Sequence, residues 1–152
     1  MTNENPLNAK IVEGLRQVVA DSYALLGQTH LCHWNVEGPS FFALHAAFEE
    51  QYTELFQAID EIAERIRALG AYAPGGLGSL AKIAGFDEIS EDASAAKMVE
   101  CLLKHNRTLI DHAALVRDVA GEKNDKETED LMIARIQVHE KTCWMLSSFL
   151  KA

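Results

Sequence analysis

The sequence has few residues that interrupt helices and no apolar run long enough to cross a membrane. It contains only three prolines, two of them beside expected helix boundaries, and almost no alternation typical of β-strands. Its three cysteines lie far apart without CxxC spacing, which is typical of free thiols in a reducing compartment. These shortages argue against a membrane-spanning protein, a disulfide scaffold and a mostly β fold.

Basic residues are also scarce, with 14 Lys and Arg against 23 Asp and Glu, which gives a formal net charge of −9. This excess disfavours binding to nucleic acid or to an anionic membrane and favours the attraction of cations. Residues 1–10 contain no basic segment followed by an apolar one, so we expect no signal peptide and a cytoplasmic location. The length and composition predict one folded domain over residues 1–152.

Apolar residues recur at helical spacing in four long segments. These segments are 6–36, 40–69, 90–120 and 125–150. Ser40 and Ser90 are the expected N-caps of the second and third helices, and Gly121 is expected to end the third. The long connection after the second helix has room for a short helix over residues 79–84. Two short turns and one long middle connection predict an all-α fold, a four-helix bundle with a crossover between helices two and three.

Two residue pairs on the second helix, His45/Glu49 and Asp60/Glu64, are mirror images about the gap between residues 54 and 55. Each pair has i,i+4 spacing, which places both side chains on one helix face. The pairs lie about 16 Å or more apart along the axis, too far to share a metal within one chain. An antiparallel second copy would bring each pair against the other pair of its partner. Such mixed imidazole and carboxylate sites suit iron, manganese or zinc.

A surface interpretation of these pairs is also open, because a single i,i+4 pair of polar residues is typical of a solvated helix face. The Glu-x-x-His signature of intrachain di-iron bundles occurs nowhere in the sequence. His33 lies twelve residues before His45, and a turn at Gly38-Pro39 would bring the two histidines towards one another. The spacing therefore favours a site between chains over an intrachain centre without deciding between metal binding and a solvated surface.

The sequence resembles the signature of the Dps miniferritins, the DNA-binding proteins from starved cells. The matching residues are His33-Trp34-Asn35-Val36-Glu37-Gly38-Pro39, Phe41, Leu44-His45, Phe48-Glu49, Asp60 and Ala63-Glu64-Arg65. The helix pattern agrees over nearly the whole chain. The resemblance implies a ferritin-like fold, assembly of twelve subunits into a shell around a cavity, and a ferroxidase centre at each two-fold dimer interface.

Carried over to this chain, the resemblance implies that iron is bound by His33, His45 and Glu49 of one subunit and by Asp60 and Glu64 of its partner. The family often has Asp where this chain has Glu49, so the carboxylate is kept with a longer reach. The implied substrates are Fe(II) and hydrogen peroxide or dioxygen, and the implied activity is that of a ferroxidase that stores ferric mineral and protects against oxidative stress.

Two further expectations follow from the resemblance. Trp34 resembles an aromatic residue beside the centre that relays electrons or radicals, although packing at a dimer interface explains its place equally well. Asp125, Glu129 and Asp130 resemble the acidic pore of the family at a three-fold axis, through which iron would enter. The alternative for these acids is a favourable interaction with the helix dipole at the start of the last helix.

Two other functional classes stay open. One is a nucleoid-associated, DNA-protecting protein with a secondary metal site, and the other is a cage that binds zinc or manganese without redox chemistry. We do not expect DNA binding, because residues 1–5 contain no Lys or Arg and Lys151 is the only charge at the end of the chain.

The remaining histidines and two aromatic residues are assigned to structural positions. His30, one turn before the signature, is expected to be a polar core residue, with a supporting role beside the metal ligands as the alternative. Tyr52 and Phe56 are expected to occupy packing positions. Three histidines lie among charged neighbours on the later helices and are expected at the surface: His105, His112 and His139.

Overall fold

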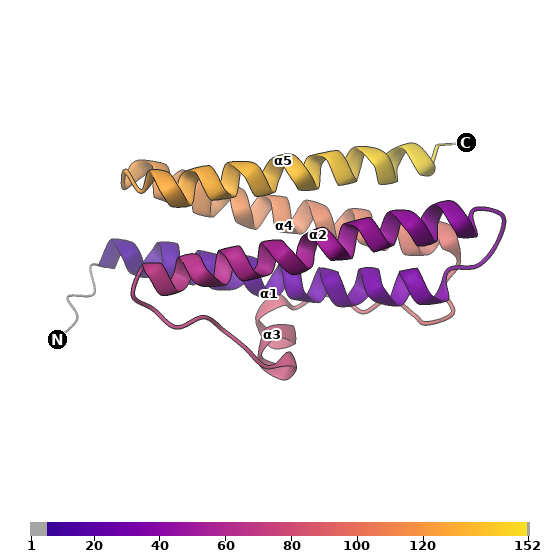
Figure 1. Ribbon diagram of the computed structural model, residues 1–152, viewed down its shortest axis with the longest axis horizontal. Helices are drawn as coiled ribbons and strands as arrows, with labels where there is room; N and C mark the ends of the chain where they lie inside the picture. The colour runs from indigo at the N-terminus through magenta and orange to yellow at the C-terminus, as the bar shows by residue number, and fades with distance from the viewer. Residues whose placement is uncertain (1–5, 152) are drawn as a thin grey trace.

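The computed structural model describes residues 6–151, which form five α-helices connected by turns and loops (Figure 1). The helices are α1 (Pro6–Asn35), α2 (Phe41–Ala68), α3 (Leu77–Ala84), α4 (Ala95–Glu122) and α5 (Lys126–Phe149). The predicted all-α fold is confirmed, including the short helix in the long connection, and the described residues contain no strand.

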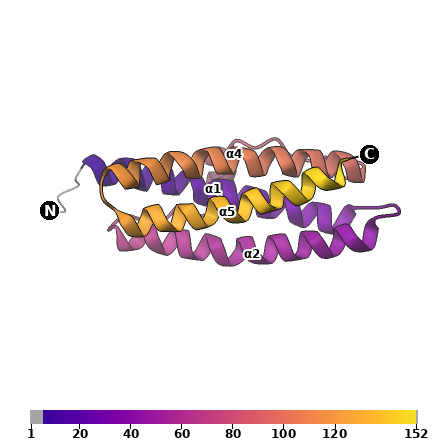
Figure 2. The same cartoon turned by 90° about the horizontal axis from the view of Figure 1, so that it is seen from above.

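The four long helices pack as two antiparallel hairpins, α1 with α2 and α4 with α5 (Figures 1 and 2). The connection that contains α3 returns along the bundle, so α2 and α4 run in the same direction (Figure 1). α3 packs against α1 within this connection, and α1 also packs against α4. The arrangement is the predicted four-helix bundle with one crossover.

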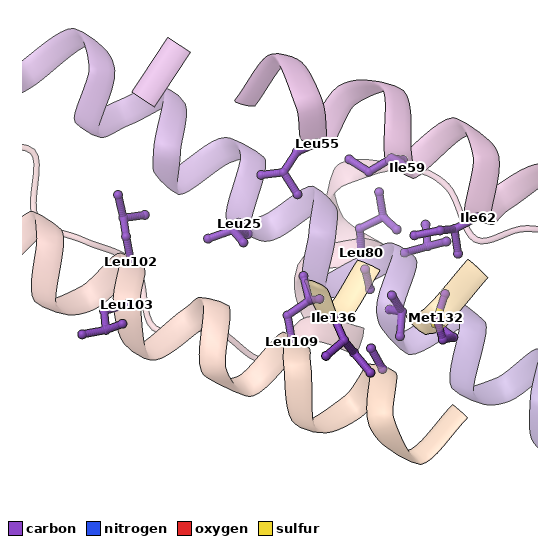
Figure 3. Close-up of a cluster of buried hydrophobic side chains, with 14 of the residues drawn as sticks. Leu25, Leu55, Ile59, Ile62, Leu80, Leu102, Leu103, Leu109, Met132 and Ile136 are labelled. Atoms are coloured by element: carbon purple, nitrogen blue, oxygen red, sulfur yellow. The ribbon is translucent and has the colours of Figure 1, made fainter. Parts of the chain in front are cut away.

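An apolar core fills the space between the long helices, and side chains from all five helices contribute to it (Figure 3). The buried residues of α2 match the predicted helical stripe: Leu44, Phe48, Leu55, Ala58, Ile59, Ile62 and Ile66. Leu80 attaches α3 to this core. Phe48 is fully buried, and the loss of such a side chain typically costs about 3–5 kcal/mol. One face of α2 is therefore committed to the core.

The turn between α1 and α2 depends on a glycine. Gly38 has a φ of 109°, a conformation that strains residues with a β-carbon. Its carbonyl accepts a hydrogen bond from the Phe41 N–H at 3.1 Å, which closes the turn. The last turn of α1 and the first turns of α2 are thereby placed side by side.

The predicted start of the third helix at Ser90 is wrong, because α4 begins at Ala95. Ser94 is the N-cap, and its Oγ accepts a hydrogen bond from the Lys97 N–H at 3.2 Å. The Ser90 hydroxyl instead donates to a carboxylate oxygen of Asp92 within the preceding loop. Both serines suit an N-cap, and tertiary packing selects the second.

Two other helix ends differ in detail from the predictions. Ser40 directly precedes α2, as predicted, but its side chain makes no capping hydrogen bond. α4 continues through Gly121 to Glu122, and Asn124 takes the positive φ of 58° that reverses the chain. Asn tolerates this left-handed conformation better than most residues, so it ends the helix in place of the predicted glycine.

The prediction that the histidines of α4 and α5 lie at the surface is wrong. His105 and His139 are buried, and His112 is half-buried. His112 Nδ1 lies 2.5 Å from Oδ2 of Asp21, which is itself fully buried. His105 stacks on Phe86 with ring centroids 4.5 Å apart. Charged sequence neighbours did not indicate exposure, because the neighbours point to other faces of the same helix.

His139 lies in a buried polar chain between α2, α4 and α5. The Arg135 guanidinium bonds Glu54 and also donates from Nη2 to His139 Nε2 at 2.9 Å. His139 Nδ1 is therefore protonated and donates to Asn106 Oδ1 at 2.8 Å. Burial, reinforced by the Arg135 cation, lowers the pKa of His139 to about 3. The imidazole is consequently neutral at physiological pH.

The hydropathy of the helices and the state of the cysteines bear on the expectations about a membrane span and about disulfides. Within residues 6–151, no helix has the length and apolar character that crossing a membrane requires. The three cysteines are free thiols, with Cys32 buried and the other two half-buried. Burial, with Cys101 nearby, raises the pKa of Cys32 to about 12, so this thiol is a poor nucleophile.

His139→Gln is expected to make the free energy of unfolding fall less steeply as the pH decreases. The folded-state pKa of His139 is depressed, so the unfolded chain binds a proton that the folded chain refuses as the pH falls below about 6. Protonation of this one group in the unfolded chain lowers the free energy of unfolding by up to about 1.4 kcal/mol for each pH unit in that window. Urea unfolding at several pH values and one protein concentration measures the slope. Equal slopes for the wild type and the variant between pH 6 and pH 4 would contradict the assignment.

Candidate metal centre

His33 and His45 meet across the turn between α1 and α2. His33 lies near the end of α1 and His45 near the start of α2, and their rings stack with centroids 3.7 Å apart and planes 14° apart. His33 is only 8% exposed, while His45 is half-buried. The structure therefore brings these two predicted ligands together, as the expected hairpin required.

Reciprocal hydrogen bonds fix the orientation of both imidazoles. His33 Nδ1 lies 2.8 Å from the backbone oxygen of His45, and His45 Nδ1 lies 2.7 Å from the backbone oxygen of His33. A carbonyl oxygen can only accept, so each Nδ1 carries the proton and donates it. In the neutral ring, the lone pair then lies on Nε2, the atom that remains able to bind a metal. This second contact of a ligating histidine is typical of metal sites in proteins.

The three predicted carboxylate ligands lie on one exposed stripe of α2. Glu49, Asp60 and Glu64 are all exposed, and helical periodicity places them within a narrow sector of the helix. Phe42 and Phe56 share this sector and are 85% and 71% exposed. Within a single chain, Phe56 therefore does not occupy the expected packing position. We call this face, formed by residues 42, 46, 49, 53, 56, 60 and 64, the α2 stripe.

Asp60 also borders a groove beside the connection to α3. The groove has a volume of about 760 Å³, and its lining includes Tyr23, Phe56, Asp60 and Leu77. Phe56 and Leu77 are large exposed apolar side chains. Asp60 and Glu64 lie in the half of α2 away from the turn, whereas His45 and Glu49 lie in the half near it, next to His33 at the end of α1. Within residues 6–151 of one chain, no three His, Cys, Asp or Glu side chains form a metal-binding group.

The predicted pore acids at the start of α5 have different environments. Asp125 is the N-cap of α5: its carboxylate accepts hydrogen bonds from Thr128 and pairs with Arg65 of α2 at 2.8 Å. Burial raises the pKa of Asp125, but the bonds from Thr128 and the charge of Arg65 outweigh it, so the pKa is lowered. Glu129 pairs with Lys126 at 2.8 Å, and Asp130 is exposed.

Trp34 and His30 lie beside the histidine pair. Trp34 is 64% exposed, and its ring stacks on His30 with centroids 4.1 Å apart. His30 is half-buried and also contacts Tyr52, which in turn contacts His33. The sequence interpretation gave Tyr52 only a packing position and did not place it beside the ligands. A usable signal was its position seven residues after His45, two helical turns along the same side of α2.

Comparisons with known proteins agree with this fold. The model of the ferritin-like domain matches residues 12–152. DNA protection during starvation protein 2 of Bacillus anthracis is 36% identical over 144 residues, covering 95% of this chain and 99% of that protein. The crystal structure of a Dps protein from Bacillus brevis has a TM-score of 0.93 at 35% identity, covering 97% of this chain and 99% of that one. A Dps protein from Vibrio cholerae O1, described as a member of a broad superfamily of ferritin-like diiron-carboxylate proteins, has a TM-score of 0.92 at 33% identity, covering 96% and 92%.

Asp125→Ala is expected to destabilise the protein by about 1–3 kcal/mol, because it removes a helix N-cap and leaves the Arg65 guanidinium without its carboxylate partner. Chemical unfolding at one protein concentration measures the change. Asp118→Ala is the control, since among residues 6–151 Asp118 pairs with Arg117 alone, on an exposed surface, and such pairs contribute about 0–1 kcal/mol. Equal stability losses in the two variants would contradict the structural role of Asp125.

Proposed function

Because the chain belongs to the Dps family of ferritin-like proteins, we propose that it is a ferroxidase and iron store. It oxidises Fe(II) with hydrogen peroxide or dioxygen at sites shared by two subunits, and it keeps the ferric product inside a cytoplasmic shell of twelve subunits. The removal of Fe(II) and peroxide together protects the cell against oxidative stress.

The observation that carries this proposal is the reciprocal hydrogen bonding of His33 and His45. Two adjacent imidazoles are held in the tautomer that keeps Nε2 available, and both rings are locked by backbone carbonyls. Glu49 lies one helical turn after His45 and provides a carboxylate on the exposed side. Imidazole and carboxylate ligands together suit iron, with positions left for an oxidant.

The α2 stripe supports a two-fold arrangement of the site. Glu49 and Asp60 are equidistant from the gap between residues 54 and 55, as are His45 and Glu64. An antiparallel copy of α2 packed on this stripe would cover Phe56 near the axis and bring Asp60 and Glu64 of the partner subunit towards His45 and Glu49. The exposed phenylalanines give this face apolar area to bury in such a dimer.

The proposed reaction transfers two electrons in one event. Two Fe(II) ions bound close together each give one electron, and peroxide takes two electrons and two protons to become two water molecules. A single Fe(II) can give only one electron, which converts peroxide to hydroxide and hydroxyl radical. The ligands contribute by holding two ions at once, and Glu64 is the carboxylate that we expect to matter most.

Iron would reach the interior through the acidic start of α5. Asp130 is exposed, which leaves it available to attract cations where three subunits meet, whereas Glu129 is half-buried and pairs with Lys126. Asp125 lies beside them, but its oxygens are engaged by Thr128 and Arg65. We therefore propose Asp130 as the principal residue of an entry pore.

Protection of DNA, which the names of relatives mention, does not require DNA contact in this proposal. The net charge of −9 on each chain repels phosphates, and a shell of many chains multiplies this charge. Consumption of Fe(II) and peroxide removes the source of hydroxyl radical. We propose that any protection by this chain is chemical.

Shells that mix His45→Ala and Glu64→Ala subunits are expected to regain activity that neither variant has alone. In a mixed dimer, one site combines the intact His45 of one subunit with the intact Glu64 of the other. Random pairing restores about a quarter of the wild-type sites. Stopped-flow absorbance of ferric product after a peroxide pulse measures the rate in shells reassembled from both variants.

Shells of each single variant, carried through the same reassembly, are the controls for this experiment. Activity in the mixed shells that stays at the level of the single variants would contradict a shared site. Fast oxidation by assembled shells of Glu64→Ala alone would remove Glu64 from the ligand set.

Asp130→Lys is expected to slow iron uptake by intact shells, because a ring of positive charge at the pore repels Fe(II). Glu100→Lys is the matched control, since it makes the same charge change on an exposed position at the opposite end of the bundle. The rate of ferric mineral formation under excess Fe(II) measures uptake. Equal rates in both variants would contradict a pore at Asp130.

A further inference from the structure

Cys32 of α1 and Cys101 of α4 lie at the same level of the bundle. The two helices pack antiparallel, and one level of their contact is marked by His112 Nδ1, which lies 2.5 Å from Asp21 Oδ2 (Figure 1). Cys32 follows Asp21 by eleven residues, and Cys101 precedes His112 by eleven. Eleven residues complete about three helical turns, so each cysteine lies on the helix face that makes this contact. The two thiols therefore face one another between α1 and α4.

The burial of the two thiols agrees with this placement. Cys32 is fully buried in the apolar core, and Cys101 is half-buried and packs against the same core. The charge of a Cys101 thiolate contributes to the raised pKa of Cys32, and such an effect requires the two side chains to be near one another. Cys101 is thus the more accessible thiol, and Cys32 is the thiol behind it.

His105 adds a free imidazole nitrogen one helical turn after Cys101. The residue is only 5% exposed, and its Nδ1 has no hydrogen-bond partner among residues 6–151. Positions i and i+4 of a helix are neighbours, and a helical side chain leans towards the preceding turn, which here contains Cys101. Burial and the nearby Lys104 cation lower the pKa of His105, so the ring is neutral at physiological pH and can accept a proton.

We propose that Cys32 and Cys101 are a peroxide-sensitive thiol pair that closes into an intrachain disulfide, with His105 as the base. His105 takes the proton of the Cys101 thiol, and the Cys101 sulfur attacks one oxygen of hydrogen peroxide. An S–O bond forms as the O–O bond breaks, so Cys101 loses two electrons and becomes a sulfenic acid. The second oxygen leaves as hydroxide and takes the proton from His105 to become water.

Cys32 completes the disulfide. Its buried thiol meets peroxide less readily than Cys101 does, but the sulfenic acid brings an electrophilic sulfur directly to it. The Cys32 sulfur attacks the Cys101 sulfur, and an S–S bond forms as the S–O bond breaks. The departing hydroxide takes the Cys32 proton and becomes a second water. Two thiols and one hydrogen peroxide are thereby converted into one disulfide and two water molecules.

The disulfide fastens the end of α1 to α4. Cys32 directly precedes His33, so the bridge links the neighbour of a proposed ligand to another helix of the bundle. The closed loop contains all of α2 and α3, and a link across a long loop restricts the unfolded chain strongly. In a reducing compartment the bond lasts only while peroxide is present. The step needs no iron, so it goes beyond the proposed ferroxidase activity.

The test uses assembled, metal-free shells of the wild type with a chelator present. The shells are treated with a few equivalents of hydrogen peroxide, and an alkylating reagent then blocks the remaining thiols. Mass spectrometry of unreduced peptides is expected to find Cys32 joined to Cys101. The free thiols of each chain are expected to fall from three to one, and dithiothreitol is expected to restore all three. Oxidised shells are expected to unfold at a higher urea concentration than reduced ones.

Two variants separate the roles of the cysteines. Cys32→Ala is expected to stop the reaction at the sulfenic acid of Cys101, which dimedone labels. Cys143→Ser is the matched control, because Cys143 is also half-buried, but the groups whose charges act on its thiol are Arg107 and Glu140. This control is expected to form the cross-link at the wild-type rate.

His105→Gln tests the base. The variant is expected to slow the cross-link severalfold at pH 7 and much less at pH 9, where thiols lose their protons to solvent without help. A merely structural role of His105 predicts the same slowing at both pH values, and that result would remove it from the reaction.

Three free thiols after peroxide treatment would overturn the pair. Oxidation of Cys101 to a sulfinic acid without a cross-linked peptide would overturn it as well, because it would show that Cys32 lies out of reach. No iron is present in these experiments, so neither result bears on the ferroxidase. The mixed shells of His45→Ala and Glu64→Ala subunits test that activity separately.

Discussion

The hydrogen bonds between His33 and His45 are the constraint on which the proposed site depends. Each imidazole donates from Nδ1 to the other residue's backbone carbonyl, so the turn between α1 and α2 and the two rings hold one another in place. Gly38 permits the turn at a positive φ. The exchange satisfies two ring N–H groups and leaves the two Nε2 atoms for another partner. The same two hydrogen bonds therefore fix both the conformation of the turn and the orientation of the two proposed ligands.

The two faces of α2 have different roles, one in core packing and the other in the proposed metal site. Its inner face supplies a stripe of buried side chains that fixes the helix against α1 and the rest of the bundle. Its outer face, the α2 stripe, has carboxylates and exposed phenylalanines in one line. Rigid attachment through the core allows ligands on the outer face to be placed accurately, as a site on a helix requires.

The sequence predicted the helices and the approach of His33 to His45, because apolar periodicity and a Gly-Pro turn are local signals. It did not predict the burial of His139, since its partner Asn106 lies on α4 and pairing across the bundle leaves no local pattern. The choice of Ser94 over Ser90 as a cap was likewise decided by packing. The place of Tyr52 beside His33 was missed because ring contacts between helices depend on side-chain direction.

Anomalous diffraction at the iron edge, from crystals of the assembled shell soaked anaerobically in Fe(II), tests the central claim most directly. The account predicts iron at the two-fold interface, bound by Nε2 of His33 and of His45 and by the Glu49 carboxylate in one subunit, and by Asp60 and Glu64 of the partner subunit. Iron bound only by residues of one chain, or absent from that interface while present elsewhere, would contradict it.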